Sequence, residues 1–343
     1  MADASLFDRM RYTLAQRLRM AWYSGHYMAA RRYSGQAPAP QGGAQPSREP
    51  VMEALRELLE RDWRNIEQGH YRMPSRLFDS PLELARLSFE FLSDLPKTAE
   101  RRARRGTREV ATEERRGRFP SYYLHNFHHQ TDGYLSERSA RLYDFQVETL
   151  FTGTAETMRR QALVPLCERL KGRDQRDMRL LDVACGTGSF LAAVKDNYPR
   201  LEVTGLDLSA DYLAVARRRL AAWRGAETAE AGAEAMPFAS ESFDVVTCIY
   251  LFHELPARVR RTVAGEMARV LKPGGRLVLV DSLQLGDRTE LDALLDAFPS
   301  SFHEPYYRSY IREELDELFA GVGLEPRGDT LAFLSKVSVF DKP

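Results

Sequence analysis

The chain has 343 residues, 43% of them hydrophobic and 10% aromatic, which is enough for about two domains with a buried core and excludes wholesale disorder. Lysine plus arginine and aspartate plus glutamate number 49 each, so the chain lacks the overall basic field of a protein that depends on phosphate contacts. We therefore expect no nucleic-acid partner.

The cysteines and the hydropathy pattern restrict the class of protein further. Cys167, Cys185 and Cys248 form no C-x-x-C pair and have no histidine at zinc-ligand spacing, so we expect neither a disulfide framework nor a structural zinc site. No segment has the roughly 18 apolar residues that cross a bilayer, and the start of the chain lacks the apolar stretch of a secretory signal. These patterns predict a cytoplasmic protein without stable membrane insertion.

The N-terminal part of the chain is predicted to be helical. Apolar residues recur at three- and four-residue steps over residues 6–28, which predicts an amphipathic helix, packed on the main body of the protein in preference to a membrane surface. Residues 34–50 are rich in Gly, Pro, Ala and Gln and predict a flexible linker. A second apolar stripe over residues 51–66 predicts another helix, which ends near Gly69.

A third helix and an arginine-rich stretch follow. Ser80, Pro81 and Glu83 offer an N-cap, a proline at the first helical position and a capping-box glutamate, which together predict a helix over residues 82–95. Residues 101–118 contain eight arginines and three glutamates without interleaved aromatic residues. This composition favours a solvated helix face or loop over a binding patch for an anionic partner.

Beyond residue 176 the pattern changes to short apolar strands that alternate with helices. The predicted strands cover residues 179–183, 202–206, 243–248 and 276–280, and the predicted helices include residues 210–223, 258–270 and 311–320. This alternation is typical of βαβ units and a parallel sheet. Two extended pieces near residues 325–329 and 332–340 predict a hairpin at the end of the chain.

A glycine-containing loop follows the first predicted strand. Gly186 and Gly188 allow the backbone to turn tightly and approach a ligand, while the N–H groups of the following helix face that ligand. Asp207, at the end of the next strand, is placed where a carboxylate grips a ribose diol. A dinucleotide fingerprint requires a third glycine where Leu191 stands. A nucleoside with a short polar tail therefore fits better than a pyrophosphate.

Four motifs in this half resemble a known family. The segments LLDVACGTGSF, VTGLDLS, AEAMPFASESFDVV and RVLKPGGRLVLVDS occur in this order over roughly residues 178–282. Together they resemble the class I S-adenosylmethionine (SAM)-dependent methyltransferases, above all the branch that includes the quinone-biosynthesis methyltransferases. The resemblance implies an α/β, Rossmann-like fold with a seven-stranded, mostly parallel sheet and an antiparallel last strand, which SKVSVFDKP suits. We expect this domain at residues 176–343, a helical accessory region at residues 1–117 and a helical cap over the active site at residues 118–175.

The resemblance also implies SAM as the cofactor and assigns residues to it. Asp182 and the loop after it would hold the methionine part, Asp207 the ribose, and Leu208 the adenine pocket. Relatives usually place an aspartate for the adenine amine where this chain has Gly232. We expect the N–H of Ala233 and apolar neighbours to hold adenine, with Glu234 or a backbone carbonyl as the alternative. The residues expected to bind the cofactor are Asp182, Ala184, Gly186, Thr187, Gly188, Asp207, Leu208, Ala233, Glu234 and Tyr250.

Three segments are expected to build the acceptor pocket, because ligands of open parallel sheets bind at the carboxyl ends of the strands. They are residues 122–134, 249–256 and 302–310. The candidate catalytic residues are Tyr134, Asn126, His129, Tyr250 and His253. Tyr134 would pack on the sulfonium, whereas His253 would act as a general base or merely cap the next helix.

Other interpretations of these segments stay open. The histidines of HNFHH and the nearby Asp132 have no recognised metal-ligand spacing, and class I transfer chemistry needs no metal, so we expect no metal. The tyrosines of residues 302–310 predict a lid or pocket wall, with a contact between two copies in a homodimer as the alternative.

The sequence thus predicts a SAM-dependent methyltransferase that acts on oxygen, nitrogen or carbon of a small molecule in secondary or cofactor metabolism. A second hypothesis with the same cofactor is a cyclase, in which the α-amine of SAM attacks its own γ-carbon and gives azetidine-2-carboxylate and methylthioadenosine. A third hypothesis, from a different class, is a non-catalytic SAM-binding subunit that serves a partner protein.

Overall fold

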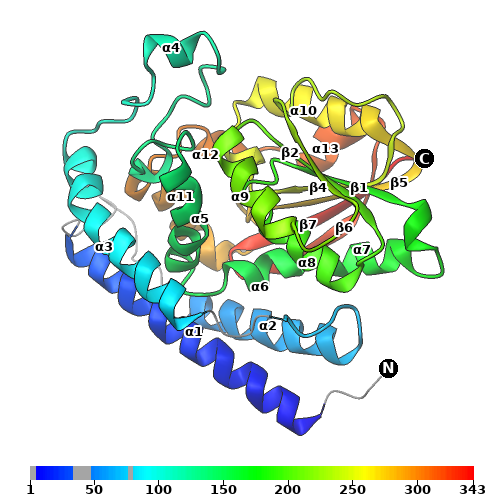
Figure 1. Ribbon diagram of the computed structural model, residues 1–343, viewed down its shortest axis with the longest axis horizontal. Helices are drawn as coiled ribbons and strands as arrows, with labels where there is room; N and C mark the ends of the chain where they lie inside the picture. The colour runs from blue at the N-terminus through cyan, green and yellow to red at the C-terminus, as the bar shows by residue number, and fades with distance from the viewer. Residues whose placement is uncertain (1–4, 34–47, 76–79) are drawn as a thin grey trace.

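A single mixed sheet organises the molecule. The computed structural model describes residues 5–33, 48–75 and 80–343, and Figure 1 shows the sheet with helices on both of its faces. Residues 34–47 of the predicted linker at residues 34–50 lie outside the described residues. The strands are β1 (Arg179–Val183), β2 (Glu202–Asp207), β3 (Ala226–Glu230), β4 (Phe243–Ile249), β5 (Leu271–Ser282), β6 (Glu325–Ala332) and β7 (Ser335–Asp341).

Helices precede the sheet and connect its strands. Those before β1 are α1 (Leu6–Tyr33), α2 (Arg48–Glu67), α3 (Pro81–Ala103), α4 (Glu113–Arg116), α5 (Glu137–Leu150), α6 (Ala155–Arg160) and α7 (Leu163–Leu170). Those after it are α8 (Ser189–Asn197), α9 (Ala210–Leu220), α10 (Ala257–Val270), α11 (Asp292–Ser301), α12 (Tyr307–Tyr310) and α13 (Leu315–Ala320). Short 3₁₀ turns are η1 (Phe127–His129), η2 (Gln175–Asp177), η3 (Phe252–Glu254) and η4 (Thr289–Leu291).

The sheet confirms the predicted fold class. Its strand order is β3-β2-β1-β4-β5-β7-β6. The first five strands are parallel, and β7 runs antiparallel to both β5 and β6. The strand order reverses between β1 and β4, so the connections leave a crevice beyond the carboxyl ends of these two strands.

The terminal hairpin is also confirmed, with shifted boundaries. β6 and β7 pair from Ala332 and Ser335 outward, around the two-residue turn Phe333–Leu334. In contrast, the sequence analysis missed β3, whose residues AETAE pair only with β2 at the edge of the sheet. An edge strand with polar residues carries no apolar run or alternation that could reveal it.

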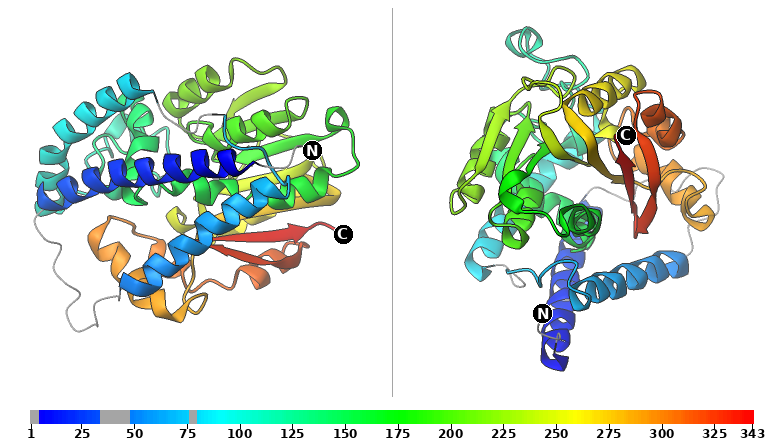
Figure 2. Two further views of the ribbon diagram at one scale, coloured as in Figure 1. Left: turned by 90° about the horizontal axis from the view of Figure 1, so that it is seen from below. Right: turned by 90° about the vertical axis from the view of Figure 1, so that its right-hand side faces the viewer.

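The first helix packs on the main body as predicted, but through a different face from its apolar stripe. The apolar stripe of α1 is exposed: Leu6, Phe7, Met10, Leu14, Leu18 and Trp22 are between 41% and 77% accessible to solvent. The buried face instead carries Tyr12, Ala15, Gln16 and Tyr23, and the Tyr12 hydroxyl donates to Asp62 of α2 at 2.6 Å. Figures 1 and 2 show α1 along the outside of the molecule. The apolar periodicity did not identify the packed face of α1, because that face packs through tyrosines, one of whose hydroxyls forms a hydrogen bond.

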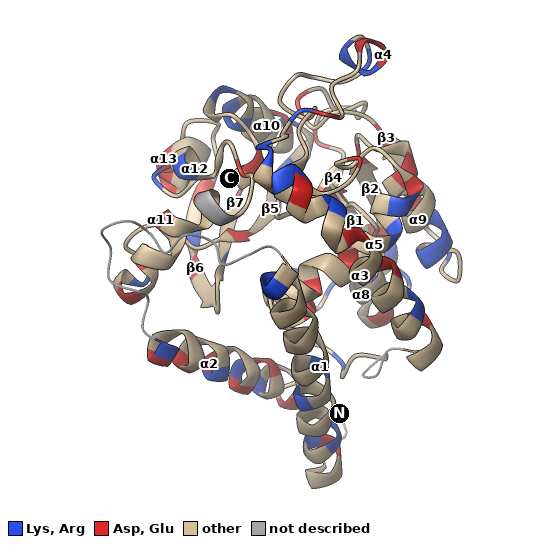
Figure 3. Ribbon diagram, turned by 90° about the vertical axis from the view of Figure 1, so that its left-hand side faces the viewer, with Lys and Arg blue, Asp and Glu red and all other residues tan. Residues whose placement is uncertain are grey.

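The other N-terminal helices largely follow the prediction. α2 spans the predicted stripe and is followed by Gly69 at φ +73°. α3 starts after Ser80 as predicted, but the Ser80 side chain makes no capping bond and the helix continues through Pro96. Figure 3 shows acidic and basic residues interspersed along the ribbon of α2.

The arginine-rich stretch and the cap complete the N-terminal part. Residues 101–118 form the end of α3, a loop and α4, and most of these side chains are accessible, although Arg101 is buried against Glu109 at 2.7 Å.

Leu58 of α2 and Met158 of α6 lie in the same apolar core as Phe243 of β4. The division of the chain at residues 117 and 175 stays a prediction. Within the described residues, every helix is too short or too polar to cross a membrane.

Candidate active site

A cleft opens at the carboxyl ends of β1, β2 and β4, where the reversal of strand order places it. The segment before α5 covers this cleft from the N-terminal side, and its lining is mainly apolar and aromatic. The lining residues are Tyr122, Tyr123, Phe127, Tyr134, Tyr143, Ala184, Gly186, Leu206, Asp207, Leu208, Tyr212, Ala231, Gly232, Ala233, Ile249, Tyr250, Leu251, Glu254 and Leu255. They combine two of the segments expected to form the acceptor pocket with the glycine loop.

The glycine loop between β1 and α8 is held in a left-handed backbone conformation. Ala184, Gly186 and Gly188 have φ values of +57°, +54° and +72°. A Cβ atom at Gly188 would lie 3.1 Å from the Cβ of Ala216 in α9, closer than ordinary van der Waals contact. Glycine is therefore required here both for its backbone angle and for the packing of α8 on α9.

Asp207 joins this loop to the end of β2. Its carboxylate accepts the N–H of Gly186 through Oδ2 and the N–H of Ser209 through Oδ1, both at 2.9 Å. Burial raises the pKa of Asp207, and these backbone bonds act in the opposite direction. Each carboxylate oxygen has further acceptor capacity, so Asp207 can also bind the two hydroxyls of a ribose.

Asp182 lies deeper, at the end of β1. It accepts the hydroxyl of Thr247 at 2.7 Å, and burial raises its pKa to about 7. Thr187, by contrast, turns its hydroxyl away from the cleft and donates to Asp144 of α5 at 2.9 Å. The loop can use the backbone of Thr187 for a ligand, while the side chain anchors the loop to the cap.

The side of the cleft expected to hold adenine contains an unpaired acceptor. Glu234 accepts the hydroxyl of Tyr122 through Oε1 at 2.7 Å. Its Oε2 is buried and has no hydrogen-bond partner within the described part of the chain. A Cβ atom at Gly232 would lie 2.9 Å from this oxygen, so the glycine that replaces the family's aspartate leaves room for Glu234.

Aromatic rings form the opposite wall. Tyr134 stacks on Phe127 with ring centroids 5.4 Å apart, and Tyr212 meets Tyr134 edge-on at 5.6 Å. The hydroxyl of Tyr134 donates to Oε1 of Glu254 at 2.5 Å. The structure thus places Tyr134 in the cleft wall, where its ring can pack on a cation while its hydroxyl is already bonded.

Tyr250 and a buried arginine lie at the end of β4. Tyr250 has φ +59° and shares a hydrogen bond with Ser335 at 2.8 Å. The guanidinium of Arg159 in α6 lies 5.8 Å from the centre of the Tyr250 ring. Burial lowers the pKa of Arg159, but Asp144 and other acidic neighbours outweigh this effect and the net pKa is raised. Arg159 is therefore a permanent positive charge next to Tyr250, which lines the cleft.

His253 belongs to a chain of polar contacts behind the cleft. Its Nδ1 lies 2.6 Å from Asp281, and its Nε2 lies 3.9 Å from Oε1 of Glu254. Burial acts to lower the pKa of His253, yet the carboxylates of Asp281, Glu304 and Glu254 raise it to about 10. The imidazole is consequently protonated at neutral pH, in which state it cannot accept a proton.

The comparisons with known proteins agree with this geometry. Residues 180–275 match the family described as "Methyltransferase domain". This part of the chain is thus similar to class I SAM-dependent methyltransferases, among them those of quinone biosynthesis. The similarity supports SAM as the cofactor.

Several relatives share this methyltransferase domain. The ubiquinone/menaquinone biosynthesis C-methyltransferase of Desulfotalea psychrophila is 34% identical over 140 residues, 41% of this chain and 53% of that protein. The demethylmenaquinone methyltransferase of Thermotoga maritima is 35% identical over 149 residues, 43% of this chain and 60% of that protein. The chain therefore spans about half the length of the curated relatives it matches. A solved SAM-dependent methyltransferase from Aquifex aeolicus is 16% identical, with a TM-score of 0.40 over 52% of this chain and 88% of that chain.

Besides His253, two predicted catalytic residues lie outside the cleft. Asn126 donates to the carbonyl of Gln130 at 3.0 Å and thereby closes its own loop. His129 is buried behind that loop, where burial and the nearby Arg102 lower its pKa to about 4. Neither is among the lining residues, whereas Tyr134 and Tyr250 are.

The sequence analysis did not single out Glu254, which lines the cleft, or Arg159, which lies behind the lining residue Tyr250. Arg159 gave no signal beyond an arginine in a short helix before the first strand. Glu254 stands next to His253 in sequence, but only the fold shows that it lines the cleft. Burial and the charge of Glu304 raise the pKa of Glu254 to about 7.

The third predicted segment forms part of the core. Tyr307 shares a hydrogen bond with the Ser282 hydroxyl at 2.6 Å, and Tyr310 donates to the Ser282 carbonyl at 2.8 Å. Both side chains are buried. These tyrosines therefore pack in fixed positions behind η3. They hold the neighbouring Glu304 beside the cap.

Proposed function

We propose that the protein transfers the methyl group of SAM to a small-molecule acceptor. The observation that carries the proposal is the bond between Asp207 and the backbone of Gly186, which presents a ribose-binding carboxylate beside the turn expected to hold the methionine part. The aromatic wall next to it excludes water and suits a sulfonium. The match of residues 180–275 to methyltransferases supports the same activity.

The cofactor would lie along the cleft from Glu234 to Arg159. Asp207 takes the ribose hydroxyls, and the buried Oε2 of Glu234 takes the adenine amine, for which it has a free lone pair. Arg159 pairs with the carboxylate of the methionine part, which a buried guanidinium binds strongly. This arrangement turns the methyl group toward Tyr134 and Glu254, where the acceptor enters.

Positioning supplies most of the rate in such a transfer. The acceptor atom and the methyl carbon are held in line at about 3–3.5 Å, within walls that keep water out. The acceptor nucleophile forms a bond to the methyl carbon as the carbon–sulfur bond breaks, which leaves S-adenosylhomocysteine. Because His253 is already protonated at neutral pH, we assign it a positioning role for Glu254 through their 3.9 Å approach.

The acceptor belongs to the small molecules, and the relatives suggest its chemistry. The curated relatives are named as C-methyltransferases of quinone biosynthesis or demethylmenaquinone methyltransferases. We propose an acceptor with a phenolic or enolic hydroxyl, in which either the oxygen or the adjacent ring carbon takes the methyl group. A setting in secondary or cofactor metabolism, a cytoplasmic location and a homodimer stay predictions.

The product derived from SAM decides between the candidate functions. Purified protein is incubated with SAM and an extract of small molecules, and the products are identified by mass spectrometry. S-adenosylhomocysteine together with a methylated acceptor supports methyl transfer. Methylthioadenosine formed without any acceptor would support the cyclase, which the aromatic wall around Tyr134 also suits. Binding of SAM without turnover in any extract would support the non-catalytic subunit.

A further inference from the structure

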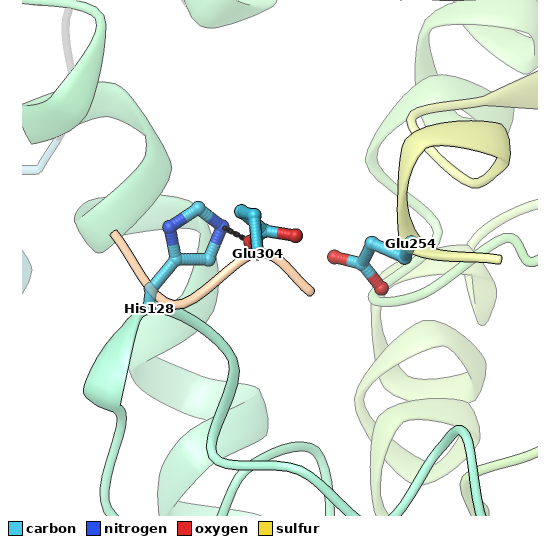
Figure 4. A group of neighbouring side chains, drawn as sticks. All are labelled: His128, Glu254 and Glu304. Carbon is cyan, nitrogen blue, oxygen red and sulfur yellow. Dashed lines mark ion pairs between the residues drawn. The ribbon is translucent and has the colours of Figure 1, made fainter. Parts of the chain in front are cut away.

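Three potential metal ligands converge at the acceptor end of the cleft. They are His128 of η1, Glu254 of η3 and Glu304 in the connection between α11 and α12, and Figure 4 shows their side chains turned toward one another. One ligand atom from each lies within 4.8 Å of the others. The Nε2 of His128 and Oε1 of Glu304 are 2.9 Å apart. Three segments far apart in sequence thus supply one nitrogen and two carboxylates.

Glu304 provides an independent sign that a ligand is expected here. The residue is only 3% exposed, and neither of its carboxylate oxygens has a hydrogen-bond donor in the described ranges. Its contact with His128 is an ion pair if the imidazole is protonated. A buried carboxylate without donors is expensive, because nothing replaces the water it has lost.

Glu254 adds a second carboxylate at the same place. Its carboxylate is fixed by the hydroxyl of Tyr134 at 2.5 Å. The neighbouring His253 is already bonded to Asp281 at 2.6 Å. The buried carboxylate of Glu304, the half-buried carboxylate of Glu254 and the imidazole of His128 thus form a compact donor set that a bound cation would satisfy.

We propose that His128, Glu254 and Glu304 bind one divalent metal ion. One imidazole nitrogen and two carboxylate oxygens suit Zn²⁺ or Mn²⁺, since mixed nitrogen and oxygen ligands are common for both. Bond lengths of about 2.0–2.2 Å require a small inward rotation of the side chains from their present spacing. The Tyr134 hydroxyl then acts as the outer partner that orients a ligating carboxylate.

The backbone of the cap supports this orientation of the imidazole. His128 adopts φ +53° and ψ +20°, a left-handed conformation that is unfavourable for a residue with a Cβ atom. Its N–H donates to the carbonyl of His303 at 3.4 Å, next to Glu304. The cap and the connection before α12 therefore hold each other where the metal ligands meet.

The consequence for the reaction rests on the proposed function. Glu254 lines the same cleft as Gly186 and Asp207, so the open coordination positions of the metal would face the acceptor. A bound divalent ion lowers the pKa of a hydroxyl that coordinates it. The hydroxyl proton leaves to solvent, and the resulting oxyanion or its conjugated carbon attacks the methyl group. The metal would thus activate an oxygen-bearing acceptor.

Metal binding can be measured without SAM or an acceptor. The full chain is treated with a chelator, dialysed, and titrated with Mn²⁺ and with Zn²⁺ by calorimetry, and bound Mn²⁺ is counted by electron paramagnetic resonance. We expect one site per chain. Glu304→Gln keeps the shape of the side chain but removes its charge, and should weaken binding at least about tenfold, as should His128→Ala.

Glu234→Gln serves as the matched control, since it also removes a buried carboxylate of the cleft but on the adenine side. Its metal affinity should equal that of the wild type. Far-ultraviolet circular dichroism and cooperative thermal unfolding of each variant show that it is folded. The proposal is overturned if the chelator-treated wild type binds neither ion, or if Glu304→Gln binds as tightly as the wild type. A failure of methyl transfer with metal binding intact would count against the proposed function alone.

Discussion

The carboxylate of Asp207 at the end of β2 accepts the backbone N–H of Gly186, 21 residues earlier in the chain, at 2.9 Å. The same carboxylate accepts the N–H of Ser209 at the start of α9. Two backbone bonds fix the orientation of this side chain before a ligand arrives, which lowers the cost of binding. The glycine loop and the carboxylate of Asp207 are therefore one structural unit.

Asp207→Ala should weaken binding of S-adenosylhomocysteine at least about tenfold, because it removes a charged acceptor for two ribose hydroxyls and releases the N–H of Gly186. Calorimetric titration measures the loss. Asp211→Asn, a change in the first turn of α9 outside the cleft lining, is the control and should bind as the wild type does. Equal affinities for Asp207→Ala and the wild type would remove Asp207 from the cofactor site.

Gly188→Ala should destabilise the protein by about 1–3 kcal/mol. The loop holds this residue at φ +72°, which is unfavourable for alanine, and the added Cβ atom would lie 3.1 Å from the Cβ of Ala216. Gly265→Ala makes the same chemical change in the middle of α10, where no atom lies within 4 Å of the added carbon. That control should stabilise the protein by roughly 0.5–1 kcal/mol. Urea unfolding of both variants measures the change in the free energy of unfolding, which should have opposite signs in the two. A Gly188→Ala variant more stable than the wild type would contradict the requirement for glycine at this position.

The pKa of His253, raised to about 10, predicts a particular pH dependence of stability. A raised folded-state pKa contributes stability that is complete below the unfolded value of about 6.5 and is lost as pH rises through the folded value. The free energy of unfolding of the wild type, minus that of His253→Gln, should therefore fall between about pH 6.5 and 10, by at most about 1.4 kcal/mol per pH unit. Denaturant unfolding at several pH values measures this difference. A difference independent of pH would show that Asp281 does not stabilise the protonated imidazole of His253.

Arg159→Met should weaken S-adenosylhomocysteine roughly tenfold or more, but leave methylthioadenosine nearly unaffected, because only the first ligand carries a carboxylate for the guanidinium. Titration with both ligands separates this role from a general loss of folding. Asp207→Ala is the useful comparison, since it should weaken both ligands through the ribose they share. An equal loss of both ligands in Arg159→Met would place the arginine in a structural role.

The sequence predicted best where one local pattern decides the structure. β1 was predicted with its observed bounds, because a strand buried on both faces reads as a short apolar run. Asp207 could be placed in the cleft because the end of a parallel strand fixes the position of the next residue. The packed face of α1 was predicted wrongly, since the polar groups of Tyr12 and Gln16 are buried there.

Long-range contacts explain most of what the sequence analysis missed. His128 and Glu304 meet only after the cap folds over the sheet, and no spacing along the chain encodes that approach. Arg159 and Tyr250 are likewise brought together only by the tertiary structure. Asn126 and His129 have residue types that suit a catalytic role, yet their orientation depends on the left-handed turns of the surrounding loop. Residue type is visible in the sequence, whereas side-chain direction is set by the tertiary structure.

Tyr134 allows the ring and the hydroxyl of one side chain to be tested separately. Tyr134→Phe keeps the ring stacked on Phe127 but removes the bond to Glu254 at 2.5 Å, so affinity for SAM should stay within about twofold while turnover falls. Tyr134→Leu also removes the ring, and should weaken SAM by about 0.5–2 kcal/mol more than it weakens S-adenosylhomocysteine, whose sulfur is an uncharged thioether, since only the sulfonium is attracted to the ring face. Calorimetry with both ligands and turnover assays of both variants provide the comparison. If Tyr134→Leu weakens the two ligands equally, the ring packs in the wall without facing the sulfonium, and the methyl group must point elsewhere in the cleft.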